Sequence, residues 1–237
     1  MICLYRQLDS TQDELKRLLA AGVEVPPGGV IQAWHQTAGR GRYGRRWTDA
    51  QGHNALFSFW LAPHLPYDRS FLLYQTAAVA MAEALNAEGI EAIIKFPNDI
   101  LWKGLKLGGI LIENTMRKNE IVRSIVGIGL NVNQTVFPAE LQAVSIRTIT
   151  GRFTPPEAWT GLLMRSFKNW WNRPARDIQA RYLYYWQFKG PKTAAEVPGK
   201  GTVKINDSFW SAQKWYIIPA KKAEPLAADP RQIRLLG

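Results

Sequence analysis

The feature of this sequence that most limits its possible folds is a series of short apolar runs in its middle third. Four runs are rich in Ile, Leu and Val: residues 90–96, 100–102, 107–113 and 121–132. Turn-forming residues such as Pro-Asn-Asp and Lys-Gly separate them. Short apolar runs joined by tight turns are typical of strands that pair with their neighbours in sequence. The pattern therefore predicts an antiparallel meander of four strands.

The segments around the meander predict further strands and several helices. Thr11 and Glu14 have the spacing of a capping box, so a helix is expected to begin there. Three more segments contain good helix formers: residues 71–85, 155–171 and 176–186. Two apolar segments, residues 30–35 and 55–61, predict strands.

The character of the sequence changes after Gly190. Short β-like pieces then lie between Gly, Pro and Asp residues: 202–205, 214–218 and 232–236. We therefore expect two domains. Residues 1–187 would form an α+β domain with a mixed, largely antiparallel sheet flanked by helices, and residues 188–237 would form a small β module.

The composition limits where the protein can be located in the cell and which partners it can bind. The chain has 237 residues and 46% hydrophobic content, but no apolar run reaches the roughly 18 residues of a membrane span. The single cysteine, Cys3, excludes an internal disulfide. These features predict a cytoplasmic protein without a membrane segment. The formal net charge of +11 is spread along the chain and favours anionic partners such as nucleotides, nucleic acids or acidic proteins.

The most informative motif is the segment 39–47, GRGRYGRRW, called the Gly/Arg loop from here on. Glycine lets a backbone approach a ligand closely, and arginine presents donors that match phosphate and carboxylate oxygens. Four like charges in nine residues repel one another unless anions relieve them. The segment predicts a phosphate-ligand site, a flexible basic loop, or an Arg/Gly segment that contacts RNA. It lacks the Gly-Lys-Ser/Thr ending of a P-loop.

Two further clusters combine glycines with polar residues. Residues 95–99 read KFPND and are followed by KLGG at 106–109, where Lys106 stands just before two glycines. Taken alone, Pro-Asn-Asp is a common turn. Residues 127–133 read GIGLNVN, and glycine inside a strand often marks the close approach of a ligand.

Together these motifs resemble those of the biotin protein ligases in content, order and spacing. The matching residues read GRGRxGRxW at 39–47, KFPND at 95–99, KLxGILxE at 106–113 and GxGxN at 127–131. The resemblance is firm over residues 5–135 and loose over 136–187. It implies a class II synthetase-like catalytic domain and a small C-terminal barrel-like module. It also implies ligation of biotin to a lysine of a carrier protein through biotinyl-5'-AMP, with ATP and Mg²⁺.

The resemblance also implies roles for individual residues. Biotin would be bound by Ser10, Thr11, Gln12, Gln36, Gly39, Arg40, Gly41, Arg42, Lys106 and Gly109. ATP would be bound by Arg42, Arg45, Trp47, Lys95, Asn98, Asp99 and Asn131. Among these, Arg40, Arg42 and Lys106 would serve catalysis, and Asp99 would meet Mg²⁺.

The sequence departs from the family pattern in three places. Gln12 and Phe96 stand where the family has Asn and Trp, and residues 190–237 match the family's C-terminal module poorly. The expected carrier is the biotin carboxyl carrier protein of acetyl-CoA carboxylase, and a homodimer is an open expectation. Because the sequence starts at the catalytic core, we expect no repressor role.

The chemistry explains the need for cations. Attack of the biotin carboxylate on the α-phosphorus of ATP brings two anions together, which repel by about 1 kcal/mol at 4 Å in water and roughly 4 at a dielectric constant of 20. Four side chains can offset this repulsion without proton transfer, together with Mg²⁺: Arg40, Arg42, Arg45 and Lys106. Three alternatives remain open: a lipoate or octanoate ligase, a nucleic-acid-binding module suggested by the charge and the ten tryptophans, and an inactive ligase.

Overall fold

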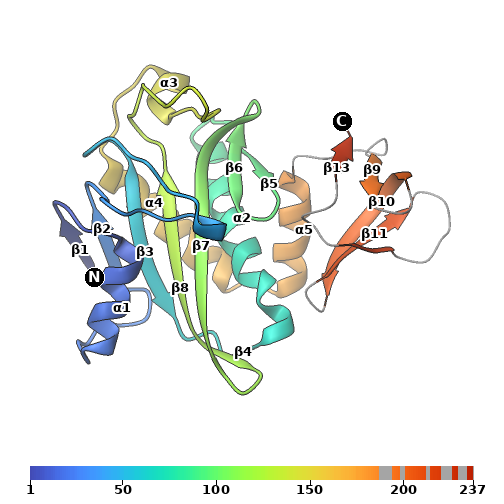
Figure 1. Cartoon of the computed structure of the whole chain (residues 1–237), viewed down its shortest axis with the longest axis horizontal. Coiled ribbons are helices and arrows are strands. Elements are labelled where there is room, and N and C mark those ends of the chain that lie inside the picture. The colour runs from blue at the N-terminus through green and yellow to red at the C-terminus, as the bar shows by residue number, and fades with distance from the viewer. Residues whose placement is uncertain (187–193, 198–200, 212–213, 220–225, 229–233, 237) are drawn as a thin grey trace.

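The computed structural model describes residues 1–186 in full and, beyond them, the backbone of 194–197, 201–211, 214–219, 226–228 and 234–236. An eight-stranded sheet forms the centre of the first part, with helices on both of its faces (Figure 1). Its strands run in the order β1-β2-β3-β8-β7-β6-β5, and β4 pairs with β8. The pair β1–β2 is parallel and the other pairs are antiparallel, which confirms the predicted mixed sheet.

The strands have the following bounds: β1 (Ile2–Tyr5), β2 (Val30–Ala33), β3 (Ala55–Leu61), β4 (Leu65–Pro66), β5 (Ile93–Lys95), β6 (Asp99–Trp102), β7 (Leu105–Arg117) and β8 (Glu120–Leu130). The helices are α1 (Thr11–Ala20), α2 (Phe71–Ala87), α3 (Ile146–Thr150), α4 (Pro156–Trp171) and α5 (Ala175–Tyr185). The predicted meander is confirmed as β5–β8. Its first strand is shorter than predicted, because Ile90 instead closes the end of α2 by donating to the Leu85 carbonyl.

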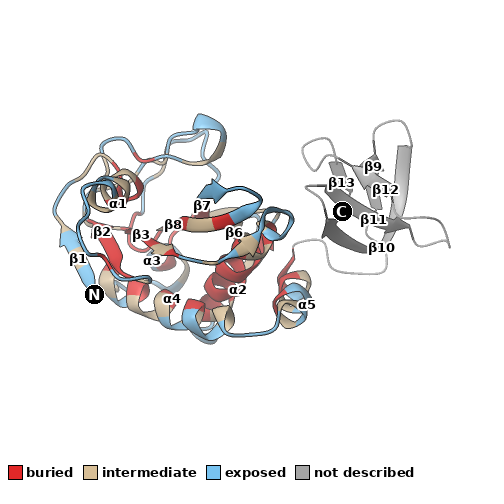
Figure 2. Cartoon of the chain, turned by 90° about the horizontal axis from the view of Figure 1, so that it is seen from below, coloured by how far each residue is buried: buried red, intermediate tan, exposed pale blue. Residues whose placement is uncertain are grey.

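The sheet separates two apolar layers (Figure 2). On one face α1 packs on β2, β3 and β8 over a small cluster around Leu15 and Ile31. On the other face α2, α4 and α5 cover the main core, where the Phe59 ring on β3 meets the Phe167 ring on α4 edge to face at 4.8 Å between centroids. The Gly/Arg loop lies on the α1 face, above strands that α1 leaves uncovered.

The first helix begins one residue earlier than the capping-box spacing predicts. Ser10 is the N-cap, and its hydroxyl accepts from the backbone N–H of Asp13 at 3.4 Å. The predicted cap, Thr11, is buried, and its hydroxyl lies within hydrogen-bond distance of the Gln36 and Ser58 side chains. The Thr11 side chain is therefore turned toward the interior instead of capping the helix.

The chain after residue 193 forms a second, antiparallel sheet. Its strands are β9 (Ala194–Val197), β10 (Gly201–Ser211), β11 (Lys214–Pro219), β12 (Leu226–Ala228) and β13 (Arg234–Leu236), in the order β12-β11-β10-β9-β13. The predicted domain boundary between 187 and 188 lies outside the described residues, and a barrel-like closure stays a prediction. None of the described helices combines the length and the apolarity that a membrane crossing requires.

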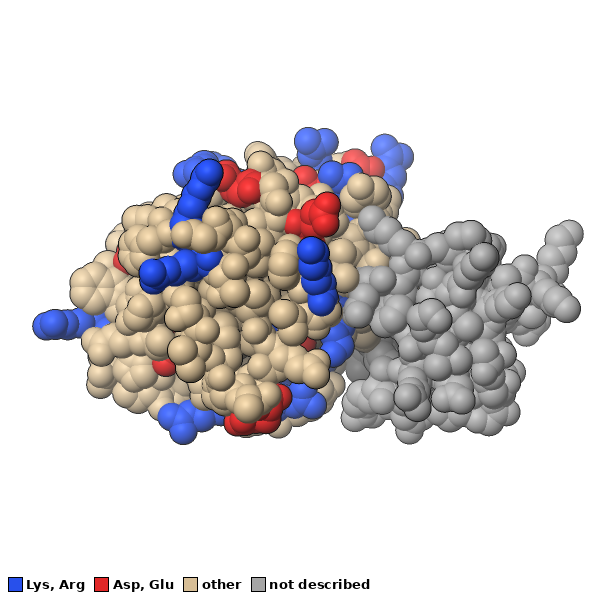
Figure 3. All heavy atoms as spheres, turned by 90° about the horizontal axis from the view of Figure 1, so that it is seen from above, with Lys and Arg blue, Asp and Glu red and all other residues tan. Residues whose placement is uncertain are grey.

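Charged side chains are mixed over the surface. On the face seen in Figure 3, Lys and Arg residues lie apart from one another, with Asp and Glu residues among them. Among the described residues, this face therefore carries no single continuous basic patch, the feature that typically binds a nucleic acid.

Candidate active site

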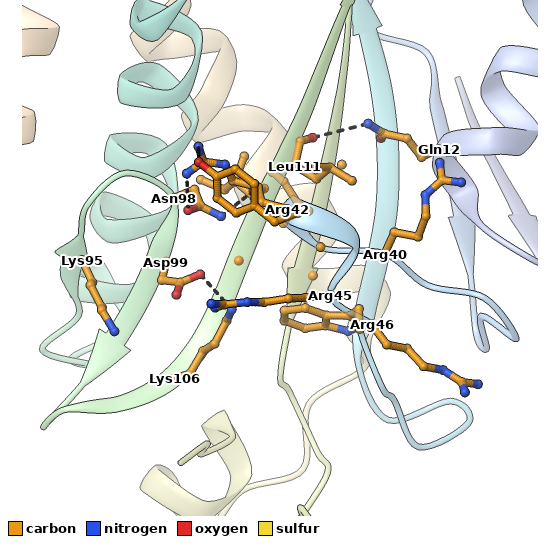
Figure 4. A pocket seen from close by; sticks show the side chains of 18 of the residues that line it. Gln12, Arg40, Arg42, Arg45, Arg46, Lys95, Asn98, Asp99, Lys106 and Leu111 are labelled. Atoms are coloured by element: carbon orange, nitrogen blue, oxygen red, sulfur yellow. Dashed lines mark hydrogen bonds and ion pairs between the residues drawn. The ribbon is translucent and has the colours of Figure 1, made fainter. Parts of the chain in front are cut away.

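A cavity of about 740 Å³ opens on the α1 face of the sheet. Its walls come from the start of α1, the Gly/Arg loop, β3, the β5–β6 turn, the glycine-containing parts of β7 and β8, and residues 140–142 (Figure 4). Of the predicted site residues, fourteen line this cavity: Ser10, Thr11, Gln12, Gln36, Arg40, Gly41, Arg42, Arg45, Trp47, Lys95, Asn98, Asp99, Lys106 and Gly109. The structure thus brings together motifs that are far apart in the sequence.

One end of the cavity is lined by amides and hydroxyls. The Gln36 Oε1 atom accepts from the Thr11 backbone N–H at 2.8 Å and from its hydroxyl at 3.1 Å. This fixes the Gln36 amide so that its Nε2 donor faces the Gly/Arg loop, 3.0 Å from where a Cβ on Gly39 would lie. The Ser58 hydroxyl, 2.8 Å from that of Thr11, extends the polar group. Sequence reasoning missed Ser58, although it is the one hydroxyl in the apolar run of β3.

Gln12 forms part of the floor at this end. Its side chain is 3% exposed, and its Nε2 donates to the Ile125 carbonyl at 3.2 Å. Its Oε1 accepts from the Ser58 hydroxyl at 3.0 Å. A Cβ on Gly127 would lie 2.6 Å from this Oε1, so the glycine makes room for the longer amide. Gln12 therefore shapes the cavity with polar atoms that already bond to the protein.

The other end of the cavity is cationic. The Lys106 Nζ atom lies 2.8 Å from Asp99 Oδ1 and 5.5 Å from the centroid of the Trp47 ring. Arg42 donates to Asn98 Oδ1 at 3.3 Å. Figure 4 shows Arg45 extended toward Asp99 and Lys106 as well. This arrangement collects positive charge around an acidic side chain and leaves donors available to an anion.

The remaining two arginines of the loop point elsewhere (Figure 4). Arg40 lines the cavity rim but forms an ion pair with Asp13 on α1 at 2.6 Å and lies 3.9 Å from Glu113 on β7. The hydrogen bond to Asp13 raises the pKa of Arg40 above its ordinary value. Arg46 also belongs to the cavity lining, and its guanidinium donates to the Thr37 carbonyl at 3.0 Å. Arg40 thus lines the cavity with its guanidinium already paired to a carboxylate.

The position of the Trp47 ring leaves no room for side chains at two glycines of the neighbouring strands. A Cβ on Gly129 would lie 2.6 Å from the ring, and one on Gly109 would lie 3.1 Å from it. Both glycines are on paired strands, so the indole lies flat against bare backbone. Its buried Nε1 atom has no hydrogen-bond partner among the described residues.

Two predicted site residues lie outside the cavity lining. Gly39 is buried at the stem of the loop, where a Cβ would lie 2.9 Å from the Trp47 carbonyl oxygen. Asn131 is 4% exposed, and its Nδ2 donates to the carbonyls of Lys106 at 3.3 Å and Val144 at 3.2 Å. Asn131 therefore braces the backbone of Lys106 instead of facing the cavity.

Residues 140–142 line the cavity without having been predicted. The Lys106 backbone N–H donates to the Gln142 carbonyl at 2.8 Å, and the Val144 N–H donates to the Lys106 carbonyl at 3.0 Å. This parallel bridge places the segment beside β7. It carries no glycine or charge motif, so its proximity to Lys106 follows only from the tertiary structure.

The cavity has few carboxylates that could bind a magnesium ion. The residues that the structure describes contain no group of three or more His, Cys, Asp or Glu side chains that could hold a metal. Asp99 and Glu140 are the carboxylates of the cavity lining, and Asp99 is paired with Lys106. Mg²⁺ is commonly held by one or two carboxylates together with substrate phosphates. The residues therefore fit a magnesium ion that arrives with a nucleotide, with Asp99 as its protein ligand.

Comparison with known proteins places the chain in a family. The model of the biotin/lipoate A/B protein ligase family matches residues 4–131, just over half of the chain. The chain belongs to this family. The match ends at Asn131 and contains every predicted site residue, so the cavity lining apart from residues 140–142 lies within the matched part of the chain.

Individual relatives agree with the assignment. The chain is 40% identical over 141 residues to the bifunctional ligase/repressor BirA of Bacillus subtilis, covering 58% of this chain and 43% of that protein. It is 32% identical over 163 residues to the biotin--[acetyl-CoA-carboxylase] ligase of Paracoccus denitrificans, covering 64% and 68%. The biotin protein ligase of Aquifex aeolicus in complex with biotin and ATP superposes with a TM-score of 0.78 at 25% identity, covering 99% and 98%. The chain thus spans less than half the length of its BirA relative.

Proposed function

We propose that this protein ligates biotin to a specific lysine of a biotin carboxyl carrier protein, through biotinyl-5'-AMP and at the expense of ATP. The observation that carries the proposal is one cavity with two chemically different ends under a single loop. The end around Gln36, Thr11 and Ser58 offers donors and acceptors to a urea ring. The end around Lys106, Arg42 and Arg45 offers cations to a carboxylate and a phosphate.

The first step joins the two ligands between these ends. A biotin carboxylate oxygen attacks the α-phosphorus of ATP, and pyrophosphate leaves. The nucleophile is ionised at neutral pH, so the step needs charge neutralisation and alignment but no general base. Lys106 would neutralise the two reacting groups, and the Asn131 amide, which donates to the Lys106 carbonyl, supports this role. Bound Mg²⁺, held by Asp99, would neutralise the phosphates.

The second step transfers biotin to the carrier. The ε-amine of the carrier lysine attacks the acyl carbon of the adenylate, an amide forms and AMP leaves. The mixed anhydride is sensitive to water, so cover by the Gly/Arg loop favours transfer over hydrolysis. The names of the Paracoccus and other relatives support acetyl-CoA carboxylase as the source of the carrier. A homodimer, a cytoplasmic location and the lack of a repressor role stay predictions.

Biotin suits the polar end better than a purely aliphatic acid. Lipoate and octanoate have no urea, so they would leave the Gln36 Nε2 donor without a partner, whereas the Thr11 and Ser58 hydroxyls already bond to the protein. An unsatisfied buried polar group costs about 1–3 kcal/mol, and sites built for hydrogen bonds discriminate strongly for that reason. We therefore propose biotin as the substrate within this family of biotin and lipoate ligases.

The decisive test is mass spectrometry of the purified protein after incubation with ATP, Mg²⁺ and one acid at a time. We expect an adenylate with biotin that requires all three components, and none with lipoate or octanoate. An adenylate with either of the other acids alone would assign the protein to that substrate. A folded protein that forms no adenylate would contradict the proposal.

A substitution on β8 tests the position of the Trp47 ring. Replacing Gly129 with alanine puts a methyl group about 2.6 Å from the indole, so the ring must move away from the backbone. If the ring supports the nucleotide, the KM for ATP is expected to rise about tenfold at saturating biotin, in line with the usual cost of overpacking. Steady-state pyrophosphate release measures this. Gly161→Ala on α4, where the nearest atom would be 3.6 Å away, is the matched control and should leave the KM for ATP unchanged.

A further inference from the structure

A pair of tyrosines holds Arg42 over the cavity. The Arg42 Cζ atom lies 4.9 Å from the centroid of the Tyr43 ring and 5.6 Å from that of the Tyr74 ring. Its Nη2 donates to the Tyr43 hydroxyl at 3.0 Å, and its Nη1 donates to Asn98 Oδ1 at 3.3 Å. We call Tyr43, Tyr74 and Asn98 the Arg42 clasp. Guanidinium groups are attracted to aromatic faces, so these contacts fix the side chain from several directions.

Tyr74 is the fixed part of the clasp. It lies on α2, behind the cavity, and its hydroxyl accepts from the Ile112 backbone N–H at 3.2 Å and donates to the Ile112 carbonyl at 3.4 Å. Burial raises the pKa of Tyr74, so the phenol stays neutral and keeps its donor. The ring is thereby attached to both the helix and β7, and it cannot follow a movement of the loop.

Asn98 is fixed in the same way. Its Nδ2 donates to the Ile110 carbonyl at 2.9 Å, and its own carbonyl accepts from the Ile110 N–H at 3.0 Å. The Asn98 Oδ1 atom is therefore directed at Arg42 by the sheet itself. Arg42 thus joins the Gly/Arg loop to two side chains that β7 holds in place.

Tyr43 is the exposed part of the clasp. It is at the tip of the loop, its ring is 70% exposed, and its backbone has the left-handed φ of 58°. A bulky residue in this conformation costs backbone energy, and so exposed a ring gains little from burial. The contacts with Arg42 are what stabilise the ring in this place.

We propose that Tyr74 is a positioning residue that docks the Gly/Arg loop over the cavity by holding Arg42 between the two tyrosine rings. Tyr74 does not line the cavity and acts only through Arg42. The docked loop forms one wall of the cavity. We expect the docked loop to slow the escape of biotinyl-5'-AMP, and this expectation rests on the proposed function.

Docking of the loop can be measured by limited proteolysis. Trypsin cleaves after the loop arginines, and cleavage of a locally opening segment follows the population of its open form. We expect cleavage after Arg45 and Arg46, followed by mass spectrometry, to be about tenfold faster in Tyr74→Leu than in the wild type, as the energy of a cation–π contact implies. Tyr74→Phe keeps the ring and should stay within about twofold of the wild type.

Two further variants separate docking from general destabilisation. Tyr43→Asn removes the other ring at an exposed position whose backbone suits Asn, so it should fold normally and be cleaved faster as well. In an Arg42→Met background, Tyr74→Leu should add no further acceleration, because both substitutions remove the same contact. An additive effect would mean that Tyr74 acts on the fold and not through Arg42, and would overturn the proposal.

The functional consequence is measured on the same proteins. Release of biotinyl-5'-AMP from the enzyme should be about tenfold faster in Tyr74→Leu and unchanged in Tyr74→Phe. Unchanged tryptic cleavage in Tyr74→Leu and Tyr43→Asn would overturn the docking role whatever the ligand results. If the wild type forms no adenylate while the cleavage pattern is as expected, the proposed function fails and the docking role of Tyr74 stands.

Discussion

Replacing Lys106 with alanine is expected to slow the formation of biotinyl-5'-AMP about 100- to 1000-fold, the usual cost of removing one preorganised group that stabilises a transition state. The Lys106 Nζ atom lies at the cationic end of the cavity, 2.8 Å from Asp99. Its backbone is fixed on both sides by residues 142–144 and by Asn131. A cation held in this way needs no reorganisation when negative charges meet during the attack. Without it, the cationic end of the cavity loses the positive charge nearest to Asp99.

The measurement is single-turnover adenylate formation with saturating biotin and ATP. Lys168→Ala, at an exposed position of α4 on the opposite face of the sheet, is the matched control and should react at the wild-type rate. Thermal unfolding of both variants should match the wild type, because Lys106 is 39% exposed at its side chain. Adenylate formation within about threefold of the wild type in Lys106→Ala would remove this residue from the chemistry.

Local patterns in the sequence predicted the elements that carry most of the cavity. The meander followed from apolar runs and turn residues between 90 and 132, and the long helices α2 and α4 followed from their composition. The edge strand β1 was missed, because residues 2–5 pair in parallel with β2 and no local turn signal links the two. A parallel partner some 28 positions away leaves no trace in local periodicity.

The sequence predicted which residues share a site but not where each side chain points. The motifs predicted that the Gly/Arg loop, Asn98, Asp99 and Lys106 belong together, and all of them line one cavity. The partner that a side chain bonds to depends on which residues lie next to it in the folded protein, and the sequence does not show this. Arg40 pairs with Asp13, and Asn131 bonds to the Lys106 carbonyl. Tyr74 escaped notice for the same reason, since one tyrosine in an apolar helix resembles an ordinary core residue.

Replacing Phe59 with alanine is expected to lower the free energy of unfolding by about 3–5 kcal/mol, a large share of the roughly 5–15 kcal/mol of a typical domain. Phe59 is fully buried on β3 and packs on Phe167 of α4, so its removal leaves a cavity between the sheet and its main helical layer. Chemical denaturation followed by circular dichroism measures the change. Phe153→Ala, at a ring that is 63% exposed, should cost less than about 1 kcal/mol.

Phe59 also tests whether stability and activity can be separated in this fold. Its neighbour Ser58 faces the α1 side, where it contacts Thr11 and Gln12, while Phe59 faces the main core. Alternating side chains of one strand thus serve the cavity and the core. Well below its unfolding transition, Phe59→Ala should therefore form the adenylate at close to the wild-type rate. A loss of less than about 1 kcal/mol in stability would mean that the helical layer collapses onto the vacated space. A loss of activity in the fully folded variant would show instead that β3 transmits core packing to the polar end of the cavity.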